Sequence, residues 1–233
     1  MRIAKFIANN GICSRRQAEK LIEQGVVSID GKIINSSAVN ISENNVIIVN
    51  GKRLEHANNP RLWIYYKPVG LITTHQDPQG RTTIFETLEG KLPRVVSVGR
   101  LDISSEGLLL LTNSGDLSRY YESPANKIER IYKVRVFGRQ KELDFQNQAI
   151  VIDGIRYHPK SIKLINKAAT NSWYEVILTE GKNREIRKIF EHFGFEVSRL
   201  IRTNFGSYSL GSLKPGEFRE VKINENYRGQ TQK

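Results

Sequence analysis

The stretch that decides the fold reads Val98-Gly99-Arg100-Leu101-Asp102-Ile103-Ser104-Ser105-Glu106-Gly107-Leu108-Leu109-Leu110-Leu111-Thr112-Asn113. An aspartate with a neighbouring arginine stands here between two apolar runs, 95–98 and 108–112, which both predict strands. Burying a carboxylate without a partner is costly, so Asp102 needs either a structural ion pair or a chemical role. The composition of this segment alone favours the ion pair.

Further short apolar runs surround this segment and are separated by turn residues. They predict a mixed, mainly antiparallel sheet with inserted helices, and therefore an α+β fold. The predicted strands are 63–66, 95–98, 108–112, 131–137, 162–165 and 173–179. A helix is clearly indicated over 184–193, because Ile186, Ile189 and Phe190 share one face opposite a basic flank. Gly194 follows as the expected helix end.

A smaller unit precedes this sheet. Apolar residues at helical spacing from Ile3 predict a first helix, and Ser14 with Gln17 has the form of a capping box that starts a second one. Short β-branched runs and Asp-Gly or Asn-Gly turns then predict a small sheet at 26–54. The polar segment 55–60 predicts a linker. We therefore expect one unit at 1–57, a second at 61–223 and a flexible tail at 224–233.

Composition restricts the possible partners. The 233 residues carry 36 Lys and Arg against 24 Asp and Glu, a net charge of +12, and the pI is about 9.8. Such a balance favours a polyanion, with nucleic acid ahead of an anionic membrane. The single Cys13 cannot form an internal disulfide, and the four histidines lack ligand spacing, so we expect no metal. No signal peptide or membrane span is evident, which predicts a soluble, cytoplasmic protein.

The N-terminal residues resemble an S4 RNA-binding domain. The resemblance rests on residues 3–22, IAKFIANNGICSRRQAEKLI, and on Gly25-Val26-Val27-Ser28-Ile29-Asp30-Gly31-Lys32 after them. The basic residues at the second helix could by themselves be a solvated helix face, which is the commoner case. The resemblance instead implies that they contact RNA phosphates. The RNA-binding residues implied here are Lys5, Arg15, Arg16 and Lys20.

The remainder of the chain resembles pseudouridine synthases of the small-subunit ribosomal RNA type. Their hallmark is Gly-Arg-Leu-Asp before a leucine run, as at residues 99–102. The accompanying motifs are Tyr65-Tyr66-Lys67-Pro68-Val69-Gly70, Asp77-Pro78-Gln79-Gly80-Arg81, Tyr132-Lys133-Val134 and Thr179-Glu180-Gly181-Lys182-Asn183-Arg184-Glu185-Ile186-Arg187-Lys188. By this resemblance Asp102 is the catalytic aspartate, Tyr132 stacks on the target uracil, and Arg187 is the basic partner of the aspartate. Arg100 would help to displace the flipped base, and Arg184 and Lys188 would contact RNA.

The resemblance implies a cofactor-free isomerisation of uridine to pseudouridine in ribosomal RNA. Details of the first and last motifs, and of the segment Asn171-Ser172-Trp173-Tyr174-Glu175-Val176, resemble large-subunit ribosomal RNA pseudouridine synthase B more than the small-subunit enzymes. We expect a monomer that acts on ribosomal RNA or a pre-ribosomal particle, with no membrane or small-molecule partner. The alternative is a non-catalytic S4-type RNA-binding or ribosome assembly protein, which would need none of Asp102, Tyr132 or Arg187.

Overall fold

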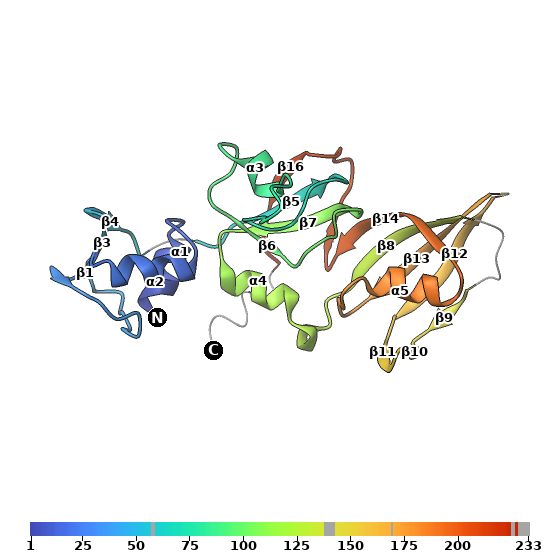
Figure 1. The fold of residues 1–233 in the computed structure, drawn as a ribbon, viewed down its shortest axis with the longest axis horizontal. Helices are drawn as coiled ribbons and strands as arrows, with labels where there is room; N and C mark the ends of the chain where they lie inside the picture. Colours follow the sequence, from blue (N-terminus) through green and yellow to red (C-terminus); the bar gives the residue numbers. More distant parts are fainter. Residues whose placement is uncertain (57–58, 138–142, 169, 225–226, 228–233) are drawn as a thin grey trace.

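The computed structural model describes residues 1–56, 59–137, 143–168, 170–224 and 227. Its elements form two groups that lie side by side along the long axis of the molecule (Figure 1). We call residues 1–56 the N-terminal unit, and the described residues from 59 onward the sheet unit.

The N-terminal unit contains two helices and a small sheet, as predicted. The helices are α1 (Ile3–Asn9) and α2 (Arg15–Glu23), and the strands are β1 (Val27–Ile29), β2 (Lys32–Ile33), β3 (Ile47–Val49) and β4 (Lys52–Leu54). The strand order is β2-β1-β3-β4, and all pairs are antiparallel. The capping box is confirmed, because the Gln17 amide N–H donates to Ser14 Oγ at 3.2 Å and Ser14 N–H donates to Gln17 Oε1 at 2.9 Å. Ile3, Ile7 and Ile22 are fully buried in the core of this unit.

The sheet unit is built on a ten-stranded mixed sheet. The order along its main path is β16-β5-β7-β14-β8-β13-β12-β9, with β6 paired to β7 and β15 paired to β14. Its strands are β5 (Leu62–Lys67), β6 (Val96–Val98), β7 (Glu106–Thr112), β8 (Arg130–Phe137), β9 (Phe145–Gln146), β12 (Ser161–Lys167), β13 (Asn171–Leu178), β14 (Glu196–Phe205), β15 (Tyr208–Ser209) and β16 (Phe218–Val221). A separate hairpin joins β10 (Ile150–Ile152) to β11 (Ile155–Tyr157). The predicted mainly antiparallel sheet is confirmed, and each strand predicted from 63 to 179 is present.

Helices cover both faces of this sheet. Because side chains alternate along a strand, Trp63 and Tyr65 of β5 join one buried cluster, while Leu62 and Ile64 join the other. The first cluster is covered by α3 (Ile84–Leu88) and α5 (Glu185–His192), and the second by α4 (Gly115–Glu122). A short 3₁₀ turn, η1 (Pro124–Asn126), follows α4. The predicted helix at 184–193 is α5, which ends just before Gly194.

The centre of the sheet depends on one glycine. β14 runs parallel to β7, with Ile201 opposite Glu106 and Arg202 opposite Gly107. Gly107 has a φ of +107°, and a Cβ there would lie 2.3 Å from the Arg202 carbonyl oxygen. Any larger residue would push the two strands apart. Gly107 therefore fixes β14 against the strand that follows the Asp102 loop.

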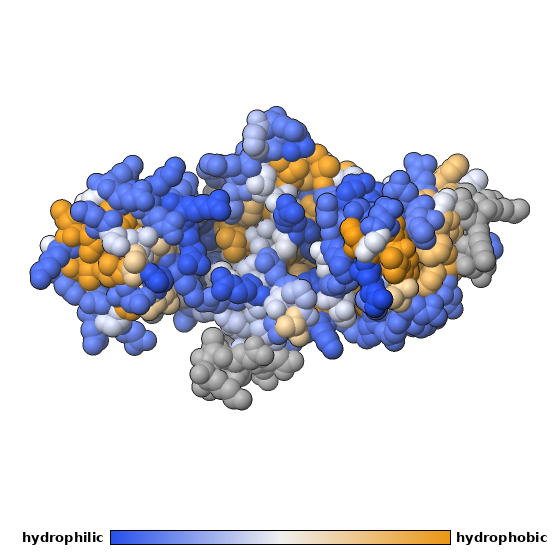
Figure 2. All heavy atoms as spheres, turned by 60° about the horizontal axis from the view of Figure 1, so that its bottom comes forward, coloured by the Kyte–Doolittle hydropathy of each residue, from blue (hydrophilic) through white to orange (hydrophobic). Residues whose placement is uncertain are grey.

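The two units touch. Lys5 Nζ on α1 forms an ion pair of 2.7 Å with Asp116 Oδ2 on α4. The expected linker falls partly outside the described residues, as does most of the expected tail. Within that tail Tyr227 is buried, and its ring lies 5.3 Å from that of Tyr120. Hydrophilic side chains cover most of the face drawn in Figure 2, with apolar side chains in separate patches.

Candidate active site

A cavity of about 620 Å³ opens in the sheet unit where the loop after β6, strand β8 and the segment before α5 meet. Asp102 and Tyr132 both line it, as do Arg100 and Arg184. Asp102 is half-buried in the loop between β6 and β7, whereas Tyr132 is only 7% exposed on β8. Two of the three predicted catalytic side chains therefore share one cavity, although they are 30 residues apart in the chain.

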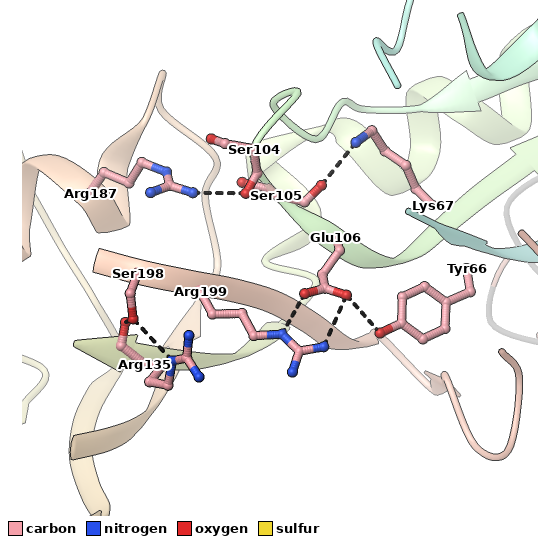
Figure 3. A network of polar contacts seen from close by, with 9 residues as sticks. All are labelled: Tyr66, Lys67, Ser104, Ser105, Glu106, Arg135, Arg187, Ser198 and Arg199. Carbon is pink, nitrogen blue, oxygen red and sulfur yellow. Dashed lines mark hydrogen bonds and ion pairs between the residues drawn. The ribbon is translucent and has the colours of Figure 1, made fainter. Parts of the chain in front are cut away.

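A buried lysine holds the loop that carries Asp102. Lys67 is fully buried at the end of β5, and its Nζ donates to the carbonyl oxygens of Pro68 at 3.0 Å, Asp102 at 3.1 Å and Ser105 at 2.9 Å. Figure 3 shows the Lys67 ammonium pointing at this turn. Burial lowers the pKa of Lys67 to about 8, against the opposing effects of the Asp102 and Glu106 charges. The loop is thus tied at both ends to one cation.

A second network lies next to this lysine (Figure 3). Arg199 of β14 donates to both carboxylate oxygens of Glu106, at 2.6 and 3.2 Å, and Tyr66 Oη donates to Glu106 Oε2 at 2.9 Å. These hydrogen bonds, the Arg199 bonds foremost, keep the pKa of Glu106 below its usual range. The first residue of β7 is therefore held by both neighbouring strands, β5 and β14.

Arg187 bridges α5 to the same loop. Its Nη2 donates to the Ser104 carbonyl oxygen at 3.0 Å, and its Nη1 donates to the Val197 carbonyl oxygen at 3.1 Å. Burial and the charge of Arg184 lower the pKa of Arg187, and the nearby Asp102 charge opposes them. No ion pair within 4.0 Å joins Arg187 to Asp102 in the described structure, nor does the Asp102 carboxylate pair with any other described residue. The structural ion pair favoured by composition is therefore not found among the described residues.

Comparison with known families accounts for this arrangement. The S4 domain profile matches residues 1–47, and the profile described as RNA pseudouridylate synthase matches residues 61–192. The second match spans more than half of the chain and includes Asp102, Tyr132 and Arg187. The chain belongs to the RNA pseudouridylate synthase family. The predicted S4 resemblance and the predicted synthase resemblance are both confirmed.

Individual relatives cover this synthase almost from end to end. An uncharacterized RNA pseudouridine synthase of Rickettsia felis is 56% identical over 223 residues, which are 94% of this chain and 96% of the relative. Ribosomal large subunit pseudouridine synthase B of Pasteurella multocida is 38% identical over 240 residues, with 97% of this chain and 68% of the relative covered. A crystal structure of a pseudouridylate synthase is 30% identical with a TM-score of 0.64, and the match covers 95% of this chain and 96% of the other.

The predicted RNA-binding residues of this synthase lie in different surroundings. Arg15, Arg16 and Lys20 are exposed on α2, and Lys188 is half-buried on α5. Arg184 is exposed in a left-handed conformation at the start of α5, and Arg100 is exposed beside Asp102. Lys5 differs from them, because its ammonium is paired with Asp116 between the two units.

Two buried arginines line the cavity and were not predicted. Arg130 and Arg202 lie 4.8 and 5.0 Å from the ring centroid of Phe205, and both are less than 10% exposed. Arg130 donates to the carbonyl oxygens of Ile128, Thr179, Tyr121 and Glu122, so it ties three stretches of the chain together. Arg202 Nε donates to the Leu108 carbonyl oxygen at 2.7 Å. Both side chains therefore satisfy backbone carbonyl groups beside the cavity.

Unsatisfied polar atoms gather at this site. Among the described residues, the buried side-chain atoms without a hydrogen-bond partner are Ser105 Oγ, Glu185 Oε1, Arg187 Nε and Arg202 Nη2. Ser105, Glu185 and Arg202 line the cavity, and Arg187 contacts the Asp102 loop. Such atoms cost stability, and their concentration here is typical of a functional site.

Glu185 gives this pseudouridine synthase a testable pH dependence. Its side chain is 3% exposed, and burial raises its pKa from 4.5 to about 7. The folded state therefore binds this proton more tightly than the unfolded state, so the associated stability is complete below pH 4.5 and is lost as pH rises to about 7. Glu185→Gln keeps an acceptor for the Lys182 N–H, which now donates to Glu185 Oε2 at 3.0 Å. We compare the free energy of unfolding of the variant with that of wild type at each pH. From pH 4 to pH 8 this difference should shift in favour of the variant by on the order of 2 to 3 kcal/mol.

Urea denaturation of both proteins at pH 4, 6 and 8 measures this difference. Glu191→Gln on the exposed side of α5 is the matched control, and its difference from wild type should not vary with pH. A Glu185→Gln difference that is the same at all three pH values would contradict the raised pKa.

Within the described ranges, no group of three or more His, Cys, Asp or Glu side chains is arranged to hold a metal ion. None of the described helices is long and apolar enough to span a membrane.

Proposed function

We propose that this synthase isomerises uridine to pseudouridine in large-subunit ribosomal RNA. The observation that carries the proposal is the shared cavity of about 620 Å³, which is lined by the buried Tyr132 and by Asp102, a carboxylate without an ion-pair partner among the described residues. The Pasteurella relative named for the large ribosomal subunit supports the choice of RNA. The non-catalytic alternative does not account for the match to the RNA pseudouridylate synthase family over residues 61–192.

The reaction needs little from the protein beyond an anion and a dry site. The N1–C1′ bond of uridine breaks, a C5–C1′ bond forms, the C5 proton leaves and N1 gains a proton, so that the product is an isomer. We assign the anionic role, as nucleophile or base, to the Asp102 carboxylate. Tyr132 provides a ring on which the flipped uracil stacks, which recovers part of the cost of unstacking.

The neighbouring arginines have supporting roles in this proposal. Arg187 lies close enough to Asp102 for the two opposite charges to attract each other, while its hydrogen bond to Ser104 positions the loop. Arg100, exposed at the cavity, helps to displace the base, and Arg184 and Lys188 contact RNA phosphates.

We further infer a cytoplasmic monomer without metal or small-molecule cofactor. The isomerisation involves no redox change and no transfer of a group between molecules. Because the proposed substrate is ribosomal RNA, free or in a pre-ribosomal particle, the cytoplasm is its place of action.

Pseudouridine mapping tests the function directly. Ribosomal RNA from cells with and without the gene should differ at one or a few large-subunit uridines, and the purified protein should restore them in RNA from the deletion strain. Identical pseudouridine patterns in the two strains would contradict the proposal.

We propose that residues 1–57 act as an RNA anchor for the catalytic residues 61–223. The N-terminal residues carry 8 basic and 5 acidic side chains, and the remainder keeps a balance of +9. Arg15 and Arg16 are exposed at the start of α2, where phosphates can approach. An anchor of this kind raises the local concentration of the catalytic unit near its target.

If residues 1–57 act as an anchor, mutations there should affect RNA binding and leave the chemical step unchanged. Arg15→Glu with Arg16→Glu should raise KM by about tenfold, with kcat on bound RNA almost unchanged. The slope of the logarithm of RNA affinity against the logarithm of salt concentration should decrease by the equivalent of about one or two phosphate contacts. Lys52→Glu with Arg53→Glu, exposed on β4 of the same unit, makes the same charge change as a control. Single-turnover kinetics across a salt series measures both effects. Loss of the chemical step with an intact salt slope would show that α2 belongs to the active site.

A further inference from the structure

An exposed imidazole is stacked on an aromatic ring at the cavity. His75 and Phe85 both line it, with ring centroids 3.6 Å apart and planes 11° apart. Phe85 is half-buried and packs against the main hydrophobic cluster, whereas His75 is exposed. No other ring of a described residue stacks on His75. The pair therefore presents a flat ring supported from one side.

Hydrogen bonds tie the segment that carries His75 to the loop that carries Asp102. Thr73, two residues before His75, donates from Oγ1 to the Leu101 carbonyl oxygen at 3.0 Å and accepts from the Leu101 N–H at 3.4 Å. Leu101 directly precedes Asp102. Because Thr73 is buried, this connection is shielded from water. The Thr73–Leu101 contact therefore fixes the backbone two residues before His75 against the backbone one residue before Asp102.

The segment after His75 is also firmly built. Arg81 donates to both oxygens of Asp77 at 2.9 and 2.8 Å, which keeps the pKa of Asp77 low, at about 2. A capping box then starts α3, with Thr83 N–H donating to Glu86 Oε2 at 2.8 Å and Glu86 N–H donating to Thr83 Oγ1 at 3.2 Å. Phe85 is the second residue of that helix. A rigid support of this kind lowers the entropy lost when a ligand stacks on it.

The charges around His75 and Phe85 are compatible with a nucleotide whose base stacks on the imidazole of His75. Desolvation, and secondarily the charge of Arg94, lower the pKa of His75, so the imidazole is neutral at pH 7 and offers a π face rather than a cation. Arg94 also lies against the N-terminal unit, with its Cβ 3.7 Å from the position of a Cβ on Gly11. Arg100 is exposed on the same cavity. Cations for backbone phosphates therefore accompany a neutral stacking surface.

We propose that His75, supported by Phe85, is a stacking subsite for an unpaired nucleobase next to the target uridine. This inference rests on the proposed function for the identity of the target, but the stacking itself requires only single-stranded RNA. The subsite would position the nucleotide next to the target uridine, whose own base enters the cavity. It would favour RNA substrates in which that neighbouring nucleotide is unpaired.

A fluorescence experiment tests the stacking without any need for turnover. His75→Trp places an indole on Phe85, and octauridylate should quench its fluorescence beyond the signal of the wild-type protein, which contains Trp63 and Trp173. An abasic RNA octamer carries the same phosphates without bases and should leave this added signal unquenched. Equal quenching by both octamers, or none by either, would overturn the subsite.

A kinetic comparison tests its use in the reaction. On unmodified ribosomal RNA, His75→Ala should weaken binding by about tenfold, whereas His75→Phe should stay close to wild type because it keeps the stacking ring. If His75→Phe were as impaired as His75→Ala, the imidazole would act through its nitrogens and the stacking proposal would be wrong. Thermal unfolding of each variant checks that the fold is unchanged. Failure of the wild-type protein to form pseudouridine would instead refute the proposed function and leave the fluorescence result standing.

Discussion

Asp102→Asn should reduce the single-turnover rate of isomerisation by at least about a thousandfold, while the affinity for RNA changes by less than about twofold. The asparagine has nearly the same shape as the aspartate but lacks the negative charge that the proposed mechanism requires. The surrounding loop should survive, because Lys67 holds the backbone carbonyl of Asp102 and not its carboxylate. The described residues give that carboxylate no hydrogen bond to lose. The substitution is therefore selective for chemistry.

Single-turnover kinetics with saturating enzyme measures the rate, and filter binding measures the affinity. Asp153→Asn in the exposed turn between β10 and β11 is a matched control, since a left-handed aspartate tolerates the amide without strain. Residual turnover of Asp102→Asn within about tenfold of wild type would remove Asp102 from its assigned role.

The N-terminal unit could be predicted in detail because its signals are local. The capping box joins residues three apart, and the turns at Asp30-Gly31 and Asn50-Gly51 join strands that are neighbours in the chain. Each of these features depends on residue types and short spacings alone. The strands from 63 to 179 were predicted for the same reason, since they are apolar and bounded by turn residues.

The centre of the sheet was missed because its signals are distant. β14 is the longest strand, but Arg199 and Arg202 interrupt its apolar pattern, and a sequence pattern does not show that their partners lie on β7. The Arg202 bond to the Leu108 carbonyl oxygen spans 94 residues. The glycine at 107 does not reveal in the sequence that β14 passes so close that a Cβ would lie 2.3 Å from the Arg202 carbonyl oxygen. Helices α3 and α4 are short and were also not predicted.

The candidate site was predicted through resemblance rather than through periodicity. Motif order pointed to Asp102 and Tyr132, and the fold brings both to one cavity. Arg187 was expected as the charge partner of the aspartate, but its hydrogen bonds go to the carbonyl oxygens of Ser104 and Val197. Lys67 was part of a motif with no assigned role. The site is therefore supported by backbone contacts that residue types alone do not reveal.

Lys67→Met should test how much this support matters. The lysine satisfies three carbonyl oxygens in and beside the Asp102 loop, and its removal leaves the carbonyls of Asp102 and Ser105 without that donor. Methionine fills a similar volume and avoids the cost of burying an ammonium, which partly offsets the loss. We expect a net loss on the order of 2 to 4 kcal/mol in the free energy of unfolding. The catalytic rate should fall by about a hundredfold, because the loop no longer holds Asp102 in one place.

Urea denaturation at 25 °C and single-turnover kinetics at the same temperature separate these two effects of Lys67→Met. Lys222→Met, at an exposed position beyond β16, is the control and should leave both quantities near wild type. Circular dichroism shows whether the variant is still folded where the rate is measured. Since Lys67 touches the loop backbone and not the cavity-lining side chains of Tyr132 or Arg184, RNA binding should be nearly retained. A folded Lys67→Met protein with a wild-type rate would mean that Gly107 and the Glu106–Arg199 pair position Asp102 without the lysine.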